Sequence, residues 1–192
     1  MNLTNHFLIA MPALQDPNFA RTVTYLFAHD EDGAMGLVIN RPAGFDLGTV
    51  LEQAGVETDG DADGYGDGDP ARNLPVMEGG PVMKERGFVL HRPAGTWEHA
   101  LAVEGEDIAV AMSRDILDAL VAGRGPRDVL VALGYAGWGP GQLEQEVGQN
   151  AWLSGPADLH IVFEAPFEDR WELAARGLGV ELHSLSGRAG HA

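Results

Sequence analysis

The chain has 192 residues, of which 45% are hydrophobic, and it contains no cysteine. This length suits one globular domain that buries roughly two-thirds or more of its unfolded surface. The lack of cysteine excludes disulfides, thiolate zinc sites and cysteine nucleophiles. The formal net charge is −17 and Lys84 is the only lysine, so the chain repels phosphates and we expect no direct binding to nucleic acid.

Neither a membrane segment nor a signal peptide is expected. No stretch approaches the ~20 apolar residues that cross a bilayer. The first residues, MNLTNHFLIAMPAL, lack a basic region, and their apolar run is short and interrupted. We therefore expect a cytoplasmic protein without membrane contact. No internal repeat is visible, so residues 1–192 are interpreted as a single domain.

The first part of the chain is predicted to be rich in strands. Residues 7–11, 22–28 and 34–40 are short apolar or β-branched runs. An Asp-Gly pair between the last two runs favours a hairpin. A helix is predicted to begin after Asp46, a residue type suited to the N-cap, and to end at Gly55.

An acidic segment then interrupts the pattern. Residues 57–69 read ETDGDADGYGDGD and cannot bury enough surface to offset the entropy of ordering, so we predict a mobile loop. The segment copies the first half of an EF-hand calcium loop, but Pro70 stands where the last ligand, a glutamate, belongs. A solvated loop is therefore favoured over weak calcium binding. The histidines lack paired ligand spacing, so no other metal site is predicted.

Short strands continue into the second half of the chain. Residues 87–91, 99–103 and 108–112 are predicted strands. Ser113 is suited to cap a following helix, and Gly123 is expected to end it.

The C-terminal part is predicted to alternate between strand and helix. Residues 159–163 are a short apolar run typical of a strand. Residues 166–178 are predicted to form a helix with Trp171 on its inward face. Residues 180–185 suggest a last strand before a loose tail at 187–192.

Residues 128–143, DVLVALGYAGWGPGQL, are the most informative stretch. The apolar run predicts a buried strand, and the four glycines after it predict a turn into a helix. Gly139 is the expected N-cap, with Gln142 reaching back to it. The spacing matches neither phosphate-binding glycine motif, and Glu144 would repel a phosphate, so no nucleotide or other cofactor is expected. A structural turn and a binding site remain the two interpretations.

Other catalytic patterns are missing. No GxSxG elbow occurs, so serine-hydrolase chemistry has no support, and Ser113 beside Asp115 is explained by helix capping. Polar residues stand at predicted strand ends, at Arg21, Asn40 and Arg41. They either satisfy backbone groups and water or converge on a pocket.

Seven motifs in a fixed order resemble those of the YqgE/AlgH family of bacterial proteins. They read FLIAMPAL, DPNF, GAMGLVINRP, GGPV, GFVLH, GYAGWGPGQLEQE and NAWL. The resemblance covers the chain from about residue 3 to its end, apart from the acidic segment. It implies an α+β fold: a single domain with a strongly bent, partly barrel-like mixed sheet flanked by helices.

The resemblance implies no particular reaction. Members of the family are often labelled transcriptional regulators, but no helix-turn-helix is established for the family. Positions in or near the matching motifs are candidates for a shared binding site, and we predict no catalytic residue among them. The candidates are Arg21, Asn40, Arg41, His91, Gly137, Gly139, Gln142, Glu144 and Asn150.

Two functional hypotheses follow. The favoured one is a regulatory protein that acts through a protein or small-molecule partner rather than by direct DNA binding. The alternative is an enzyme of unassigned class with its site at residues 134–143, where Glu144 would serve as acid or base only if its surroundings shifted its pKa. A shared site requires Asn40, Glu144 and Asn150 to line one cleft.

Overall fold

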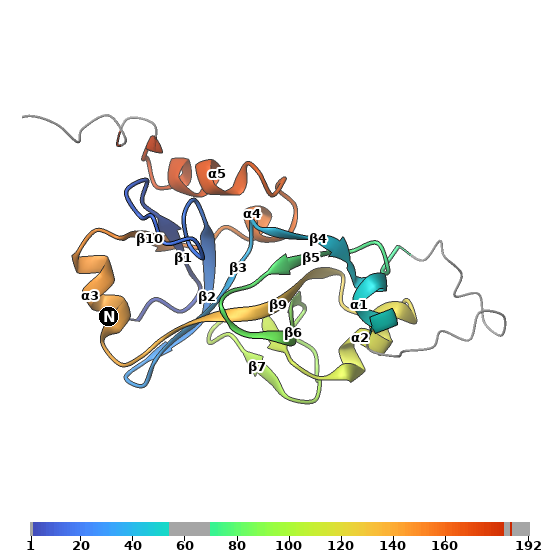
Figure 1. Ribbon diagram of the computed structural model, residues 1–192. Helices are drawn as coiled ribbons and strands as arrows, with labels where there is room; N and C mark the ends of the chain where they lie inside the picture. The colour runs from blue at the N-terminus through green and yellow to red at the C-terminus, as the bar shows by residue number, and fades with distance from the viewer. Residues whose placement is uncertain (1, 54–69, 183–184, 186–192) are drawn as a thin grey trace, which may run out of the picture.

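The computed structural model describes residues 2–53, 70–182 and 185, so the predicted loop at 57–69, the predicted helix end at Gly55 and the predicted tail at 187–192 lie outside the described part. The strands, drawn in Figure 1, are β1 (His6–Ala10), β2 (Val23–Asp30), β3 (Gly33–Val38), β4 (Pro42–Asp46), β5 (Pro75–Glu78), β6 (Val82–Arg92), β7 (Ala100–Ala102), β8 (Ala109–Ala111), β9 (Asp128–Trp138) and β10 (Trp152–Pro156). They are accompanied by the helices α1 (Leu47–Gln53), α2 (Arg114–Val121), α3 (Gln142–Gly148), α4 (Leu159–Phe163) and α5 (Arg170–Gly177).

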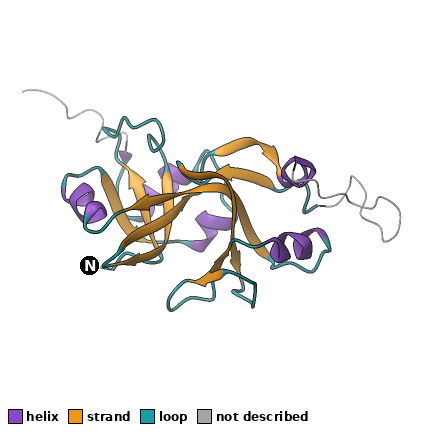
Figure 2. Cartoon of the chain, turned by 60° about the horizontal axis from the view of Figure 1, so that its bottom comes forward, coloured by secondary structure: helices purple, strands orange, loops and turns teal. Residues whose placement is uncertain are grey.

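The strands of the described residues form one curved ten-stranded sheet. Its main path runs β10-β1-β2-β3-β9-β6-β8-β7, and β5 pairs with both β4 and β9. The β5–β9 pairing is parallel and its neighbours β4–β5 and β6–β9 are antiparallel, so the sheet is mixed. Figure 2 shows the sheet curling on itself, with helices outside it and at its ends. This architecture confirms the predicted α+β class and the strongly bent, partly barrel-like sheet.

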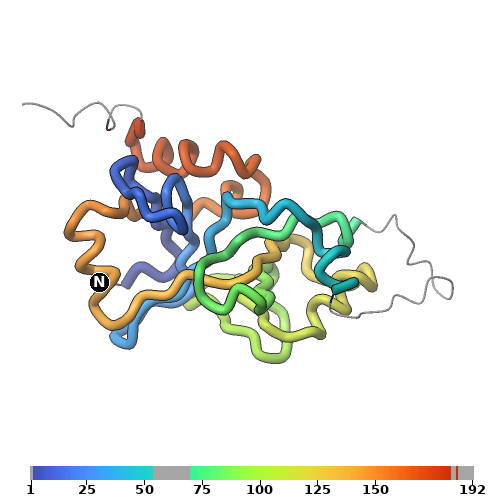
Figure 3. Tube along the Cα trace, in the orientation of Figure 1, coloured from blue at the N-terminus to red at the C-terminus, as the bar shows by residue number. Residues whose placement is uncertain are grey.

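Strand β9 joins the two halves of the sheet. Its first half pairs with β5 and β6, and its second half pairs with β3. The tube in Figure 3 shows β9 crossing the molecule from the α2 side to the α3 side. The predicted strand in this stretch is confirmed, and both halves of the sheet pair with it.

The prediction that a glycine turn begins at Gly134 was wrong. Gly134 and Gly137 lie inside β9, and the turn comprises only residues 139–141. Gly134 has φ +72°, and a Cβ there would lie 2.5 Å from the carbonyl oxygen of Gly80. The glycine therefore permits the β5–β6 connection at Gly80 to pass β9 at close range, and it does not reverse the chain.

Several local predictions are confirmed. The predicted hairpin is formed by β2 and β3, and its loop has two residues, since Asp30 pairs with Gly33. The Asp46 carboxylate accepts hydrogen bonds from the Thr49 N–H and hydroxyl at 2.9 and 2.8 Å, and it thereby starts α1. Trp171 of α5 is buried in the largest core cluster, as predicted for its inward face, although α5 begins at Arg170 rather than at residue 166.

Two strand predictions near the C-terminus were wrong. Residues 159–163 form α4, because the Asp158 carboxylate accepts the His160 N–H at 2.9 Å and caps a helical turn. A five-residue apolar run does not by itself distinguish a buried helical turn from a strand. Leu182 and Leu185, in the predicted last strand, are helical. No helix in the described ranges is long and apolar enough to span a membrane.

Candidate functional site

Asn40 connects the end of β3 to the start of β2. Its side-chain oxygen accepts the Val23 N–H at 2.8 Å, and its amide donates to the Arg21 carbonyl at 3.0 Å. The Arg21 guanidinium lies 4.4 Å from the centre of the Trp171 ring, so its exposed charge rests on α5. Asn40 therefore joins the chain after β3 to the start of β2, and Arg21 contacts helix α5.

Arg41 anchors the loop that leads into β2. Its guanidinium donates to the carbonyls of Pro17, Asn18 and Ala20 at 2.9, 2.8 and 3.1 Å. Its own carbonyl accepts the Glu78 N–H at 2.8 Å. The carbonyls of Pro17, Asn18 and Ala20 accept N–H groups of the guanidinium but do not neutralise its positive charge. Arg41 therefore still attracts anions in addition to anchoring the loop.

The turn before α3 satisfies its own polar groups. The Gln142 side-chain oxygen accepts the Gly139 N–H at 3.0 Å, which confirms that Gln142 reaches back to the turn. The N-cap itself is Gly141, with φ +72°, and not Gly139 as predicted. Gly137 lies in β9, paired with Met35 of β3. Gly137 is therefore part of the sheet, and Gly139 and Gly141 belong to the turn that leads from β9 to α3. These glycines form strand and turn rather than a cradle of backbone N–H groups.

Glu144 pairs with a buried histidine. Its Oε1 lies 3.0 Å from His29 Nε2, while His29 Nδ1 accepts the Leu3 N–H at 2.9 Å. Because Nδ1 is an acceptor, Nε2 carries the proton, and the Nε2–H group donates a hydrogen bond to Glu144. Hydrogen bonds from its own backbone N–H and from His29 lower the pKa of the Glu144 carboxyl. Both ring nitrogens are occupied, so this pair offers none to a substrate.

Asn40 and Glu144 lie at opposite ends of β2. Asn40 bonds Val23 at its first residue, and Glu144 bonds His29 near its last. Six residues of strand at ~3.3 Å each separate the two bonded positions by roughly 20 Å. The hypothesis that Asn40, Glu144 and Asn150 line one cleft was therefore wrong. Asn150 is exposed after α3, with a left-handed φ of 59°.

His91 lies apart from both groups. It is fully buried in β6, where its Nδ1 donates to the Pro93 carbonyl at 2.9 Å. Within the described part of the chain its Nε2 has no hydrogen-bond partner. Burial lowers the pKa of His91, which keeps the ring neutral.

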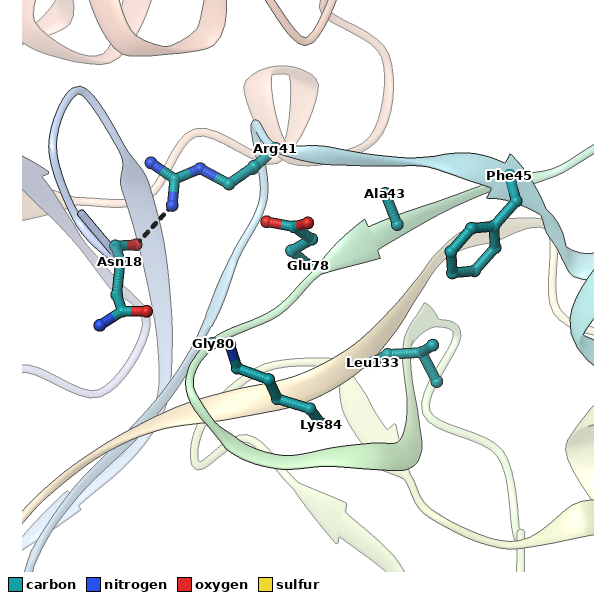
Figure 4. Close-up of a pocket in the computed structure, with 8 residues that line it drawn as sticks. All are labelled: Asn18, Arg41, Ala43, Phe45, Glu78, Gly80, Lys84 and Leu133. Carbon is teal, nitrogen blue, oxygen red and sulfur yellow. Dashed lines mark hydrogen bonds between the residues drawn. The ribbon is translucent and has the colours of Figure 1, made fainter.

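One candidate residue, Arg41, lines a groove on the sheet. The groove has a volume of about 200 Å³ and lies among β4, β5, β9 and the start of β6. Figure 4 shows its lining residues, which are Asn18, Arg41, Ala43, Phe45, Glu78, Gly80, Lys84 and Leu133.

The groove combines an apolar floor with charged walls. In Figure 4 the ring of Phe45 points toward Leu133, the carboxylate of Glu78 points toward Arg41, and the Lys84 side chain extends toward Gly80. Phe45 is 40% exposed, which is unusual for an aromatic side chain and leaves one wall apolar and open to solvent. The groove therefore offers cationic, anionic and hydrophobic contacts in a small space.

The first residues of β6 form one wall, at a point where the sheet is irregular. The β6–β9 register shifts between Val82 and Gly87, and residues 83–86 of β6 are exposed. Met83, 49% exposed, has a left-handed φ of 50°, a conformation that non-glycine residues seldom adopt. A Cβ on Gly80 would lie 2.2 Å from the Tyr135 carbonyl carbon, so only glycine allows this crossing of β9.

Sequence reasoning missed most of the groove. The one usable signal was that Lys84 is the only lysine of an acidic chain. Phe45, Glu78 and Leu133 carry no motif, because their proximity depends on the pairing of β4, β5 and β9. Glu146 was missed as well: its carboxylate accepts the indole N–H groups of Trp138 and Trp152 at 3.0 and 2.8 Å.

The described contacts give no support to an enzyme centred on residues 134–143. The side chains of Gln142, Glu144 and Glu146 all bond other groups of the same chain. General acid–base catalysis needs a group positioned to reach the reacting atoms of a substrate. The groups at this turn instead join α3 to the sheet.

Comparisons with known proteins agree with the fold. The AlgH-like family model matches residues 7–183. A UPF0301 protein of Thioalkalivibrio sulfidiphilus is 55% identical over 191 residues, covering 100% of this chain and 97% of that protein. A UPF0301 protein of Nitrosococcus oceani is 54% identical over 188 residues, covering 98% and 96%.

Solved structures show the same architecture. The solution structure of the AlgH protein from Pseudomonas aeruginosa has a TM-score of 0.78 and 49% identity, covering 100% of this chain and 97% of that one. A crystal structure of a Corynebacterium diphtheriae protein, at 19% identity, shares the fold with a TM-score of 0.70 and coverage of 97% and 92%. The family match, the close relatives and the curled sheet agree, and the chain belongs to the AlgH-like family.

Proposed function

We propose that this protein is a regulatory cytoplasmic protein that binds a protein or small-molecule partner in the groove around Arg41, Glu78 and Lys84 and makes no direct contact with DNA. The observation that carries the proposal is the groove itself. It brings two cations and a half-exposed aromatic ring together on a chain whose net charge is −17.

The groove suits recognition rather than chemistry. Arg41 is fixed by three carbonyls, so it presents its charge in one place with little entropy left to lose. Lys84 is exposed and forms no ion pair among the described residues, so its ammonium is available to an acidic group. Phe45 and Met83 add exposed apolar surface of the kind found at binding sites.

Direct DNA binding is opposed by charge. A protein that neutralises phosphates needs a basic surface, and this chain has 12 basic and 29 acidic residues. We expect no specific complex with duplex DNA at physiological salt. A gel shift at nanomolar protein with a clear sequence preference would contradict this part of the proposal.

The test maps partner contacts onto the groove. A photo-crosslinking amino acid is placed at Phe45 in one variant and at Leu101, an equally exposed apolar residue of β7, in the other. Isotope-labelled protein is screened in parallel by NMR against a library of small acids and peptides. We expect crosslinks from position 45 only, and shift changes confined to residues 41–45 and 78–84.

Charge variants then separate the groove from the general field of the protein. Lys84→Gln removes one of the two cations of the groove, and Arg124→Gln removes an exposed cation just beyond α2. We expect Lys84→Gln alone to weaken binding of the captured partner, by about 3-fold to 30-fold for the loss of one charged contact. Equal crosslinking from positions 45 and 101, or equal losses in both charge variants, would refute the groove as the site.

A further inference from the structure

A second cavity lies between the α4–α5 connection and the strands β5 and β9. Its volume is about 290 Å³, and its walls are mostly apolar, including Met77, Leu130, Val162 and Phe167. Pockets for small molecules usually span ~300 to ~1,000 Å³, so the volume of this cavity lies just below that range and suits only a small ligand. It shares no lining residue with the groove around Lys84, so it is a separate feature of the fold.

Arg170, the first residue of α5, lines this cavity while only 3% exposed. Its Nε donates to the Ala165 carbonyl at 3.0 Å, and one terminal nitrogen donates to the Ile39 carbonyl at 2.5 Å. The Phe167 ring lies 4.6 Å from the guanidinium carbon. These three contacts hold the guanidinium in one orientation against the cavity wall.

The guanidinium is only partly satisfied. An arginine carries five N–H donors, and the second terminal nitrogen of Arg170 has no hydrogen bond to any described residue. Burial lowers the pKa of Arg170 to about 10, so the group is still a cation at neutral pH. A fixed, buried cation with spare donors is the arrangement that proteins use to hold a carboxylate or phosphate.

No protein anion compensates this charge. Across residues 2–53 and 70–182, no carboxylate lies within ion-pair distance of Arg170. Glu164 also lines the cavity, but it is exposed and its Oε2 lies 3.2 Å from His160 Nδ1. Burying a cation without a counter-charge is costly, and the backbone carbonyls offset only part of that cost.

We infer that the Arg170 cavity binds a small organic acid, whose carboxylate pairs with the guanidinium and whose apolar or aromatic body fills the rest of the space. The cavity volume excludes a nucleotide or a long lipid chain. The apolar walls select an acid with a hydrophobic body over inorganic phosphate. This site does not depend on the groove around Lys84, and either can be refuted without the other.

The experiment compares acids with neutral molecules of the same shape. Benzoate and hexanoate are titrated into the full-length protein, followed by NMR and calorimetry, beside benzyl alcohol, hexanol and inorganic phosphate. For ligands this small we expect dissociation constants on the order of 1 mM. The acids should bind about tenfold or more tightly than the matched alcohols, because one charge-assisted contact has an effect of this size. Inorganic phosphate, which has no apolar body, should bind more weakly than the alcohols.

Variants assign the effect to this cavity. Arg170→Met removes the charge while keeping a similar length, and we expect a loss of about tenfold or more in benzoate affinity. Arg176→Met, which removes an exposed charge from the same helix, should leave that affinity unchanged. If Arg170→Met does not fold, Val129→Phe supplies the test, because it narrows the cavity and leaves Arg170 in place.

Three outcomes would overturn the inference. The first is equal binding of acids and alcohols by the wild-type protein. The second is benzoate affinity that survives either Arg170→Met or Val129→Phe. The third is the absence of any saturable binding up to about 20 mM, which would show that the buried charge is structural only.

Discussion

His29 and Glu144 join the end of the β2–β3 hairpin to helix α3. The 3.0 Å contact between His29 Nε2 and Glu144 Oε1 is one half of a chain of hydrogen bonds whose other half is the Leu3 N–H donated to His29 Nδ1. The His29 ring is buried and the Glu144 carboxylate is 40% exposed, so the buried ring has a hydrogen-bond partner that is itself in contact with solvent. It explains why both residues are polar at a packed junction.

Replacement of Glu144 tests this junction. In Glu144→Gln, the amide oxygen still accepts from His29 but no longer bears a charge, so we expect a lower melting temperature near neutral pH. The pKa of Glu144 is lowered in the folded state, so its stabilising contribution is present above the ordinary value of about 4.3 and disappears as the pH falls through the folded pKa. Thermal unfolding at several pH values should show the gap between wild type and variant closing in acid. A gap that is constant with pH would contradict the stabilising role assigned to the Glu144 carboxylate.

Glu146 stabilises the aromatic cluster of Trp138 and Trp152. One of its oxygens accepts both indole N–H groups, and Glu146→Ala leaves those donors in an apolar setting without a partner. We expect the free energy of unfolding to fall by about 2 kcal/mol, measured by urea denaturation with tryptophan fluorescence. Gln145→Ala, an exposed position of the same helix, is the control and should change stability by less than about 0.5 kcal/mol.

Gly134 permits the crossing of β9 with the chain at Gly80. Gly134→Ala introduces a Cβ 2.5 Å from the Gly80 carbonyl oxygen at a left-handed φ. We expect a loss of at least ~2 kcal/mol of stability, or failure to fold. The control is Gly148→Ala in α3, where a Cβ meets no atom within 4 Å and a gain of about 0.5 kcal/mol is expected. Similar stability of the two variants would refute this account of the bend.

His91 is expected to make the fold sensitive to mild acid. Burial lowers its pKa, so the unfolded chain takes up a proton at about pH 6.5 while the folded chain does not, and stability is lost as the pH falls below that value. The slope attributable to one such group is at most ~1.4 kcal/mol per pH unit. His91→Asn keeps a donor for the Pro93 carbonyl and does not titrate, so chemical denaturation between about pH 7.5 and 5.5 should show a flatter profile.

A control histidine separates this effect from general acid sensitivity. His160 is exposed and its ring nitrogen lies 3.2 Å from Glu164. His160→Asn should retain the wild-type slope in the same pH range. Identical slopes in wild type and His91→Asn would show that the buried ring does not control the acid response.

Predictions from the sequence were correct where they depended on interactions between residues close together in the chain. The Asp46 cap, the β2–β3 hairpin and the inward face with Trp171 each depend on residues a few positions apart. The motifs that resemble the YqgE/AlgH family are also short stretches of contiguous sequence, and the family and the α+β class were predicted from them. Such features need no knowledge of which distant segments pair.

The tertiary structure decided the rest, because the remaining features depend on contacts between segments far apart in the chain. Gly134 continues a strand because the chain at Gly80 crosses it there, and glycines alone do not distinguish a close crossing from a turn. The groove exists because strand pairing brings Arg41 beside Glu78 and Lys84. Arg170 is ordinary by sequence, and its buried, unpaired charge appears only once Ile39 and Ala165 close around it.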